Sequence, residues 1–280
     1  MIARVRWLGH ATTVLDLDGV RIVTDPLLGR HAGLLRRRGR VPEDEDWQDP
    51  DVVLISQLHH DHAELSSLRR LGSAPVLTAP ANASWLRGRG IESAVGLHDD
   101  WFRVLGRSSG RARTERADPV DGGRGEVEVR LVPAVHGDRP MPHRPNAVNG
   151  HLVRSRSVTV WVAGDTAPYR GMAGLPELAG APLDVVIVPV GGWGPKLSGG
   201  HMDPVQAAEV CHLVGARLAI PVHWGTLHAP ASRRLPPGWM DRAGPAFAAA
   251  LAHHAPQCRA LVLQLGERVD LTRLLDERLA

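Results

Sequence analysis

The 280-residue sequence has little cysteine, tyrosine or phenylalanine, and it contains no apolar run long enough to span a membrane. Its two cysteines, Cys211 and Cys258, exclude a disulfide framework of the kind that stabilises small secreted domains. The first residues lack the apolar core of a secretory signal peptide. We therefore expect a reduced, cytoplasmic protein that does not insert into a membrane.

Lysine is also scarce, and arginine supplies almost all of the positive charge in a chain whose net charge is only +3. Arginine clusters at 36–38 and between 103 and 116, but these clusters lack the interleaved aromatic side chains that stack on bases. We expect a small-molecule substrate and no nucleic acid. At 280 residues the chain allows one large domain or two small ones, and its apolar fraction of 43% is ample for a core. The order of strands and helices described below leads us to expect a single domain over residues 1–280. Homo-oligomerisation stays open.

Histidine is abundant in contrast, with 15 residues, and three of them fall in one short segment. An apolar run at 51–55, which reads as a buried strand, leads into His59-His60-Asp61-His62. Leucines at helical spacing follow between 64 and 71. Three imidazoles and a carboxylate cannot all be satisfied within a core, and they match the nitrogen and oxygen ligands of Zn, Mn or Fe. The segment predicts a metal site.

Apolar alternation and β-branched runs predict the other strands of the chain. They are expected at 5–25 (as a hairpin), 74–78, 126–133, 151–163, 183–190, 218–222 and 260–265. Helices are expected at 204–213, with Asp203 as N-cap, and at 242–254, whereas 27–49 reads as a long loop. Both halves begin with strands and continue with strand–helix units. This order predicts an α/β fold with duplicated layers around one core.

Four of the predicted strands end in a histidine or an aspartate. Besides the segment at 59–62, the strand ends carry His136, Asp165 and His223. A histidine at a single strand end is more often a hydrogen-bonded turn residue than a ligand. Because ligands gather at the C-terminal ends of strands in α/β sheets, the recurrence predicts that these side chains converge on one site.

Together these motifs resemble the metallo-β-lactamase superfamily, in particular the branch that contains ascorbate-6-phosphate lactonase and the N-acylphosphatidylethanolamine-hydrolysing phospholipase D. The resemblance covers nearly the whole chain. Beyond the histidine-rich segment and His136, it rests on Trp7-Leu8-Gly9-His10-Ala11-Thr12, Thr24-Asp25-Pro26, Gly164-Asp165-Thr166, Gly200-His201-Met202-Asp203-Pro204 and Pro221-Val222-His223-Trp224-Gly225. It implies an αββα sandwich, in which helices flank two mixed β-sheets, with a binuclear metal site along one edge of the paired sheets.

The resemblance also implies a ligand set. The first cation would be held by His59 and His136, the second by Asp61, His62 and His223, and Asp165 would bridge the two. Asp61 would also orient the attacking water or carry its proton.

Other residues would act around this set. His201 would bind substrate or donate a proton, and a structural histidine at a helix N-terminus is the competing interpretation. Asp25 would accept a hydrogen bond from a ligating imidazole. His10 is expected to be structural. Lys196 is a candidate contact for a phosphate or carboxylate, and a solvated surface side chain is the competing interpretation. Trp193 and Trp224 could line an apolar pocket.

Gln57 departs from the family pattern His-x-His-x-Asp-His, whose first position it occupies. Its amide oxygen is a weak ligand for Zn and a better one for harder cations. Three hypotheses follow: Gln57 ligates through its oxygen in a weakened first site, the first site is empty and one cation remains, or the fold has lost catalysis and serves in binding. His60 is out of register, so we expect it to point away.

The resemblance implies a metal-dependent hydrolase that uses activated water on a phosphodiester or on a lactone-like ester. It would hold one or two divalent ions, with Zn as the first choice and Mn or Fe as alternatives. The alternative is a mononuclear or non-hydrolytic member of the fold, which would act as a biosynthetic enzyme or a binding protein.

Overall fold

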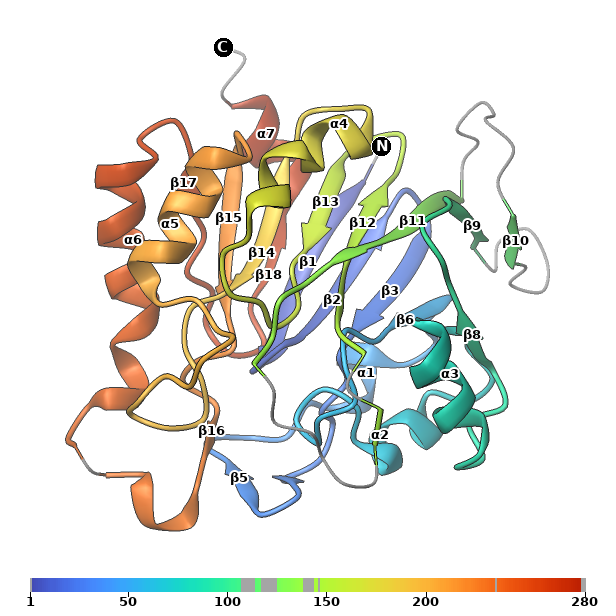
Figure 1. Ribbon diagram of the computed structural model, residues 1–280, viewed down its shortest axis with the longest axis horizontal. Coiled ribbons are helices and arrows are strands. Elements are labelled where there is room, and N and C mark those ends of the chain that lie inside the picture. The colour runs from blue at the N-terminus through green and yellow to red at the C-terminus, as the bar shows by residue number, and fades with distance from the viewer. Residues whose placement is uncertain are drawn as a thin grey trace.

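The computed structural model describes residues 2–106, 125–137, 144–145, 147–234 and 236–277, together with the backbone of 114–116. Within these residues two large mixed sheets pack face to face, and helices cover their outer sides (Figure 1). No helix of the described part of the chain is both long and apolar enough to cross a membrane. Residues 107–113 of the arginine-rich segment lie outside the described residues.

The first sheet carries the N-terminal strands. Its order is β18 (Arg268–Asp270), β1 (Ala3–Gly9), β2 (Thr12–Leu17), β3 (Val20–Thr24), β6 (Val52–Leu54), β7 (Val76–Thr78) and β8 (Ala94–Gly96). Pairing is antiparallel from β18 to β3 and parallel from β3 to β8. The predicted hairpin is present, with the turn at residues 18–19.

The second sheet repeats this plan. Its order is β10 (Thr114–Arg116), β9 (Phe102–Leu105), β11 (Glu126–Pro133), β12 (Asn149–Arg154), β13 (Thr159–Val162), β14 (Val185–Pro189), β15 (Leu218–Val222) and β17 (Arg259–Ala260). Pairing is antiparallel as far as β13 and parallel beyond it. The duplicated arrangement predicted from the order of strands and helices is therefore present.

Helices occupy the outer layers. They are α1 (Asp44–Trp47), α2 (Leu65–Arg70), α3 (Pro80–Arg87), α4 (Leu175–Ala179), α5 (Pro204–Leu213) and α6 (Ala243–His254). A further helix, α7 (Leu271–Asp276), packs Leu271 and Leu275 into the core between the sheets. The predicted N-cap of α5 is confirmed, because the side chain of Asp203 accepts hydrogen bonds from the backbone amides of Val205 and Gln206.

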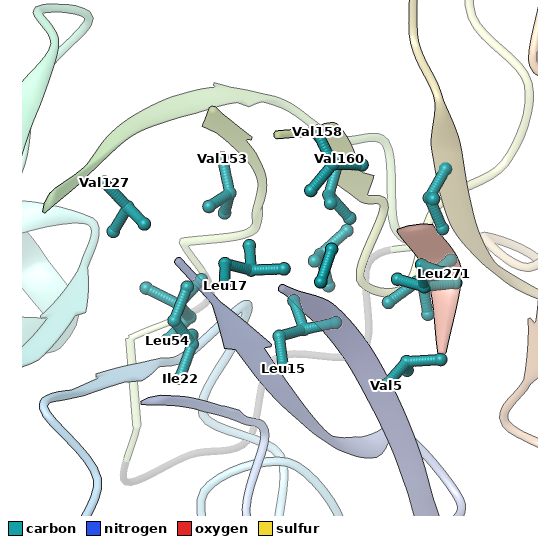
Figure 2. Close-up of a cluster of buried hydrophobic side chains, with 14 of the residues drawn as sticks. Val5, Leu15, Leu17, Ile22, Leu54, Val127, Val153, Val158, Val160 and Leu271 are labelled. Carbon is teal, nitrogen blue, oxygen red and sulfur yellow. The ribbon is translucent and has the colours of Figure 1, made fainter. Parts of the chain in front are cut away.

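The core between the sheets is built from the inward face of each strand. Figure 2 shows Leu15 and Ile22 of the first sheet packed towards Val153 and Val160 of the second. Trp161, the next residue along β13, is fully buried on the opposite side, in the layer beneath the helices. A strand such as β14 is buried on both faces, which explains its uninterrupted apolar sequence.

Two segments differ from the expectations. The predicted loop at 27–49 contains α1 and two short strands, β4 (His31–Ala32) and β5 (Leu35–Arg37), which form a small sheet with β16 (Leu227–His228). The predicted strand at 260–265 was wrong for most of its length. There the chain crosses from the second sheet to the first, and Leu261 and Leu263 alternate because they fill the core between the sheets.

The buried position of Leu15 predicts the size of its contribution to stability. Leu15→Ala should lower the free energy of unfolding by about 3 kcal/mol, because it removes buried methyl groups and leaves a cavity between the sheets. Chemical denaturation followed by circular dichroism measures this loss. The matched control is Leu34→Ala, since Leu34 is 91% exposed, and we expect a change within about 0.5 kcal/mol. Equal effects of the two changes would contradict the assigned core.

Candidate metal centre

The loops that follow four strands meet at one edge of the sandwich. His62 follows β6, Asp165 follows β13 and His223 follows β15 directly, and their side chains lie against one another. His136, in the loop after β11, lies in a second group with Asp165 and His201, and Asp165 also contacts His62 and His223. The structure thus brings together the side chains that the strand ends and the resemblance pointed to.

The tightest group consists of two imidazoles and two carboxylates. The Nε2 atoms of His62 and His223 are 3.2 Å apart. Asp165 places Oδ2 at 2.9 Å from Nε2 of His62 and Oδ1 at 3.1 Å from Nε2 of His223. Asp61 Oδ2 lies 3.6 Å from Nε2 of His223. All four residues are buried, so water cannot screen these atoms from one another.

The hydrogen bonds on the other side of each ring fix the position of its proton. Nδ1 of His62 is 2.9 Å from a carboxylate oxygen of Asp25, and Nδ1 of His223 is 3.0 Å from the carbonyl oxygen of Gly191. Both oxygens only accept, so each Nδ1 carries a hydrogen. In the neutral rings the two Nε2 atoms therefore turn lone pairs towards each other and towards Asp165. Such an arrangement needs a positive charge between the rings, supplied by further protons or by a cation.

The pKa values of these groups show the same demand for positive charge. Burial lowers the pKa of His62, but the carboxylates of Asp165, Asp25 and Asp61 outweigh burial and raise it well above its usual value. Burial likewise lowers the pKa of His223, yet Asp165 and then Asp61 raise it to about 9. Burial raises the pKa of Asp165, whereas His223 and His62 hold it well below its usual range. Imidazole nitrogens and carboxylate oxygens in this arrangement fit a divalent cation such as Zn²⁺.

The backbone at this edge is held in unusual conformations. His10, Asp25 and His223 have φ angles of 51°, 38° and 65°, in a region that L-residues rarely adopt. The amide of His223 donates to the carbonyl oxygen of His10 at 2.9 Å, so two of the strained segments support each other. Strain of this kind persists where the surrounding contacts fix it, and it concentrates at functional sites.

Sequence reasoning favoured a structural role for His10 over a catalytic one, and the structure places His10 beside the ligand atoms of Asp61 and His223. Its Nε2 is 2.9 Å from Oδ2 of Asp61, and its ring centroid is 3.8 Å from that of His223. Burial and the neighbouring His223 lower the pKa of His10 to about 3, so the ring is neutral and its Nε2 donates to Asp61. The sequence signal for this contact was the motif Trp7-Leu8-Gly9-His10-Ala11-Thr12, which the family resemblance shares.

The second group consists of His136, Asp165 and His201, whose potential ligand atoms lie within 4.8 Å of one another. His59 is half-buried beside it, with its ring centroid 5.1 Å from that of His136. Gln57 is buried, and its Nε2 donates to Oδ2 of Asp165 at 2.6 Å. The amide oxygen of Gln57 has no hydrogen-bond partner among the residues described.

A cavity of about 410 Å³ opens over the second group. Its polar side includes His59, His136, Asp165 and His201 together with Asp61, and its apolar side includes Ala32, Leu34, Leu35 and Trp193. A second cavity, of about 280 Å³, lies on the other side of the loop at 191–197 and is lined by Trp224, Trp239 and Arg242 among others. Trp193 and Trp224 thus face two different cavities.

Two of the remaining residues lie away from the ligand atoms. Lys196 is exposed and lines neither of these cavities, and its proposed contact with an anion stays a prediction. His60 is exposed and its Nδ1 accepts from Arg144 at 3.1 Å, so it points away from the cluster as expected. Part of the loop that carries Arg144, residues 138–143 and 146, lies outside the described residues.

The sequence of this chain is similar to those of proteins that are named as hydrolases. The chain is 28% identical over 241 residues to N-acyl-phosphatidylethanolamine-hydrolyzing phospholipase D 1 of Caenorhabditis elegans, covering 79% of this chain and 63% of the relative. It is 28% identical over 230 residues to a UPF0173 metal-dependent hydrolase of Methanopyrus kandleri, covering 80% and 84% of the two chains. The chain therefore spans less than two thirds of the length of the worm enzyme.

A solved structure shares the fold. The structure of a metallo hydrolase from Ignicoccus hospitalis superposes with a TM-score of 0.67 at 19% identity and covers 96% of this chain and 98% of its own. The family profile described as "Beta-lactamase superfamily domain" matches residues 20–224, which is well over half of the chain. With its paired mixed sheets and its histidine and aspartate side chains at the strand ends, this chain belongs to the metallo-β-lactamase superfamily.

Proposed function

We propose that this chain is a cytoplasmic, metal-dependent hydrolase that directs activated water at a small-molecule ester or lactone. One observation carries the proposal: the Nε2 atoms of His62 and His223 face each other at 3.2 Å, beside two carboxylates, next to an open cavity. Both relatives described above are named for hydrolysis. Zn²⁺ is the first choice of cation for this donor set, with Mn²⁺ or Fe²⁺ as alternatives.

A divalent cation at such a site polarises a substrate oxygen and lowers the pKa of water from 15.7 to about 7. The residues of the chain position the other reacting groups. Asp61 is anionic and reaches the cavity, and the hydrogen bond from His10 orients its carboxylate, so it is placed to accept a proton from the attacking water.

The cavity favours an uncharged substrate over a phosphodiester. Its apolar wall includes Leu34, Leu35 and Trp193, which suit an alkyl or aryl group. Among the described residues that line it, none is arginine or lysine, the side chains that usually bind a phosphate. We therefore rank esters and lactones before phosphodiesters.

Gln57 favours a second candidate function. It provides no imidazole at the first position of the family pattern, and its amide donates to Oδ2 of Asp165 at 2.6 Å. A single cation on Asp61, His62 and His223 would suit a mononuclear enzyme with non-hydrolytic chemistry or a binding protein.

Removal of either facing imidazole should abolish hydrolysis together with the cation between them. We expect His62→Ala and His223→Ala each to lose the cation held by these two imidazoles and to reduce the turnover of p-nitrophenyl butyrate at least about 100-fold, because each change removes a cation ligand. Metal content is measured by elemental analysis and turnover with Zn²⁺ or Mn²⁺ present. A γ-lactone and bis(p-nitrophenyl) phosphate test the ranking of substrates.

The matched control is His98→Ala, which removes an exposed imidazole that lines neither of the two cavities described above and should leave both measurements unchanged. Full esterase activity in chelator-treated protein without metal would contradict the proposed function. Turnover of the phosphodiester in preference to the esters would contradict the ranking of substrates but not the proposed hydrolase function.

Asp25 fixes the orientation and the proton of His62. Its two carboxylate oxygens accept from the backbone amide of Ser56 at 2.8 Å and from the hydroxyl of Ser56 at 2.7 Å, and Oδ2 also faces Nδ1 of His62. A partner held in this way keeps the lone pair of Nε2 directed at the cation.

We expect Asp25→Asn to weaken metal affinity by 10- to 100-fold, which is roughly the usual effect of losing such a partner. Competition with a chromophoric chelator measures the affinity. Asp18→Asn is the matched control, because Asp18 also accepts from the amide and the hydroxyl of a serine, Ser157, but contacts no histidine of the cluster. Equal affinity in both variants would refute the role of Asp25.

A further inference from the structure

Gln57 leaves the first cation position one imidazole short of the family pattern, and the structure places another imidazole there. His201 lies in the loop before α5, where its Nε2 is 3.4 Å from Oδ2 of Asp165. Its ring centroid is 4.7 Å from that of His136. The side chain of His201 is only 7% exposed, so it belongs to the interior of the site.

The hydrogen bonds of the two rings direct both lone pairs inward. Nδ1 of His136 is 2.9 Å from the carbonyl oxygen of Gly200, and a carbonyl oxygen only accepts, so Nδ1 of His136 carries the hydrogen. Nδ1 of His201 lies 3.1 Å from the hydroxyl oxygen and 3.2 Å from the carbonyl oxygen of Ser198. A hydrogen on Nδ1 of His201 satisfies both contacts, because the hydroxyl oxygen can accept as the carbonyl oxygen does. Each Nε2 then has a lone pair available to a cation. The backbone fixes the orientation of each ring, as is usual for metal-ligating histidines.

Two glycines allow this approach. Gly200 has φ of +87°, and a Cβ atom on it would overlap the amide nitrogen of Gly137. A Cβ on Gly137 would in turn lie 2.9 Å from the carbonyl oxygen of Gly199, closer than real Cβ atoms come. The loop that carries His201 therefore packs backbone to backbone against the end of the loop that carries His136. Their proximity follows from this packing and does not depend on flexible side chains.

Gln57 contributes to the same site through a hydrogen bond. Its Nε2 donates to Oδ2 of Asp165 at 2.6 Å, which holds the carboxylate that contacts His62, His223 and His201. An amide nitrogen directed at this oxygen is a hydrogen-bond donor and has no lone pair for a cation. The position that the family gives to an imidazole therefore serves here to orient Asp165.

We propose that His201 replaces the imidazole missing at position 57, so that the first cation is held by His136, His201 and Asp165, with His59 beside them. This inference rests on the proposed function, because it supplies a second cation to the same hydrolytic site. It differs from the substrate-binding or proton-donating role that the family resemblance implies for His201.

Metal stoichiometry tests the replacement without any measurement of activity. Protein is loaded with Zn²⁺, dialysed against metal-free buffer and analysed for bound metal. We expect two equivalents in the wild type and in the control His98→Ala, and one equivalent in His201→Ala. The double variant Gln57→His with His201→Ala should return to two equivalents, because it restores an imidazole at the family position.

Two further measurements guard against a loss caused by misfolding. Circular dichroism and thermal unfolding establish that each variant is folded. His201→Asn provides a second variant with a polar side chain, in which we expect the affinity for the cation beside His136 to fall at least tenfold. Titration of the wild type with Co²⁺, followed by visible absorption, should show two successive binding steps without any substitution.

The outcomes separate this inference from the proposed function. Wild-type protein that binds one equivalent and hydrolyses esters would overturn the inference and leave the function intact. His201→Ala that keeps two equivalents but loses turnover would show a substrate contact and overturn it as well, and so would a double variant that stays at one equivalent. Wild-type protein that binds no metal and hydrolyses nothing would overturn the proposed function itself.

Discussion

The site depends on one electrostatic constraint: two buried imidazole lone pairs and two buried carboxylates need positive charge between them. The Nε2 atoms of His62 and His223 face each other at 3.2 Å, and hydrogen bonds on the far side of each ring keep them there. Without a compensating charge the arrangement would be repulsive in an environment that water cannot screen. A metal ion satisfies all of these atoms together.

The fold maintains this constraint by packing the site against rigid strands. The cores on both faces of the second sheet fix the strands whose ends carry Asp165 and His223, and the first sheet supplies His10 and the histidine-rich segment. Strained backbone at His10 and His223 is stabilised by a hydrogen bond between the two residues. The geometry of the site is therefore a property of the paired sheets.

Gln57 and His201 indicate how a metal site can change its ligands while its position in the fold is kept. A ligand from one loop can be exchanged for a ligand from another when both loops reach the same carboxylate, and Asp165 contacts both side chains. The carboxylate of Asp165 then determines where cations bind, and the imidazoles that complete the site can come from different loops. Solved neighbours at less than 20% identity show that the fold itself tolerates extensive sequence change.

The sequence by itself determined the local elements and the strand-end residues, because apolar periodicity and N-cap chemistry act over a few neighbouring residues. It predicted β11 and β15 with their bounds, the cap at Asp203, and His62 and His223 as members of one site. Only the tertiary structure decided that leucines near 261 cross between sheets and that His10 holds Asp61. It also decided that His201 lies beside His136, because that contact depends on two glycines, Gly137 and Gly200, which are distant in sequence and pack backbone to backbone.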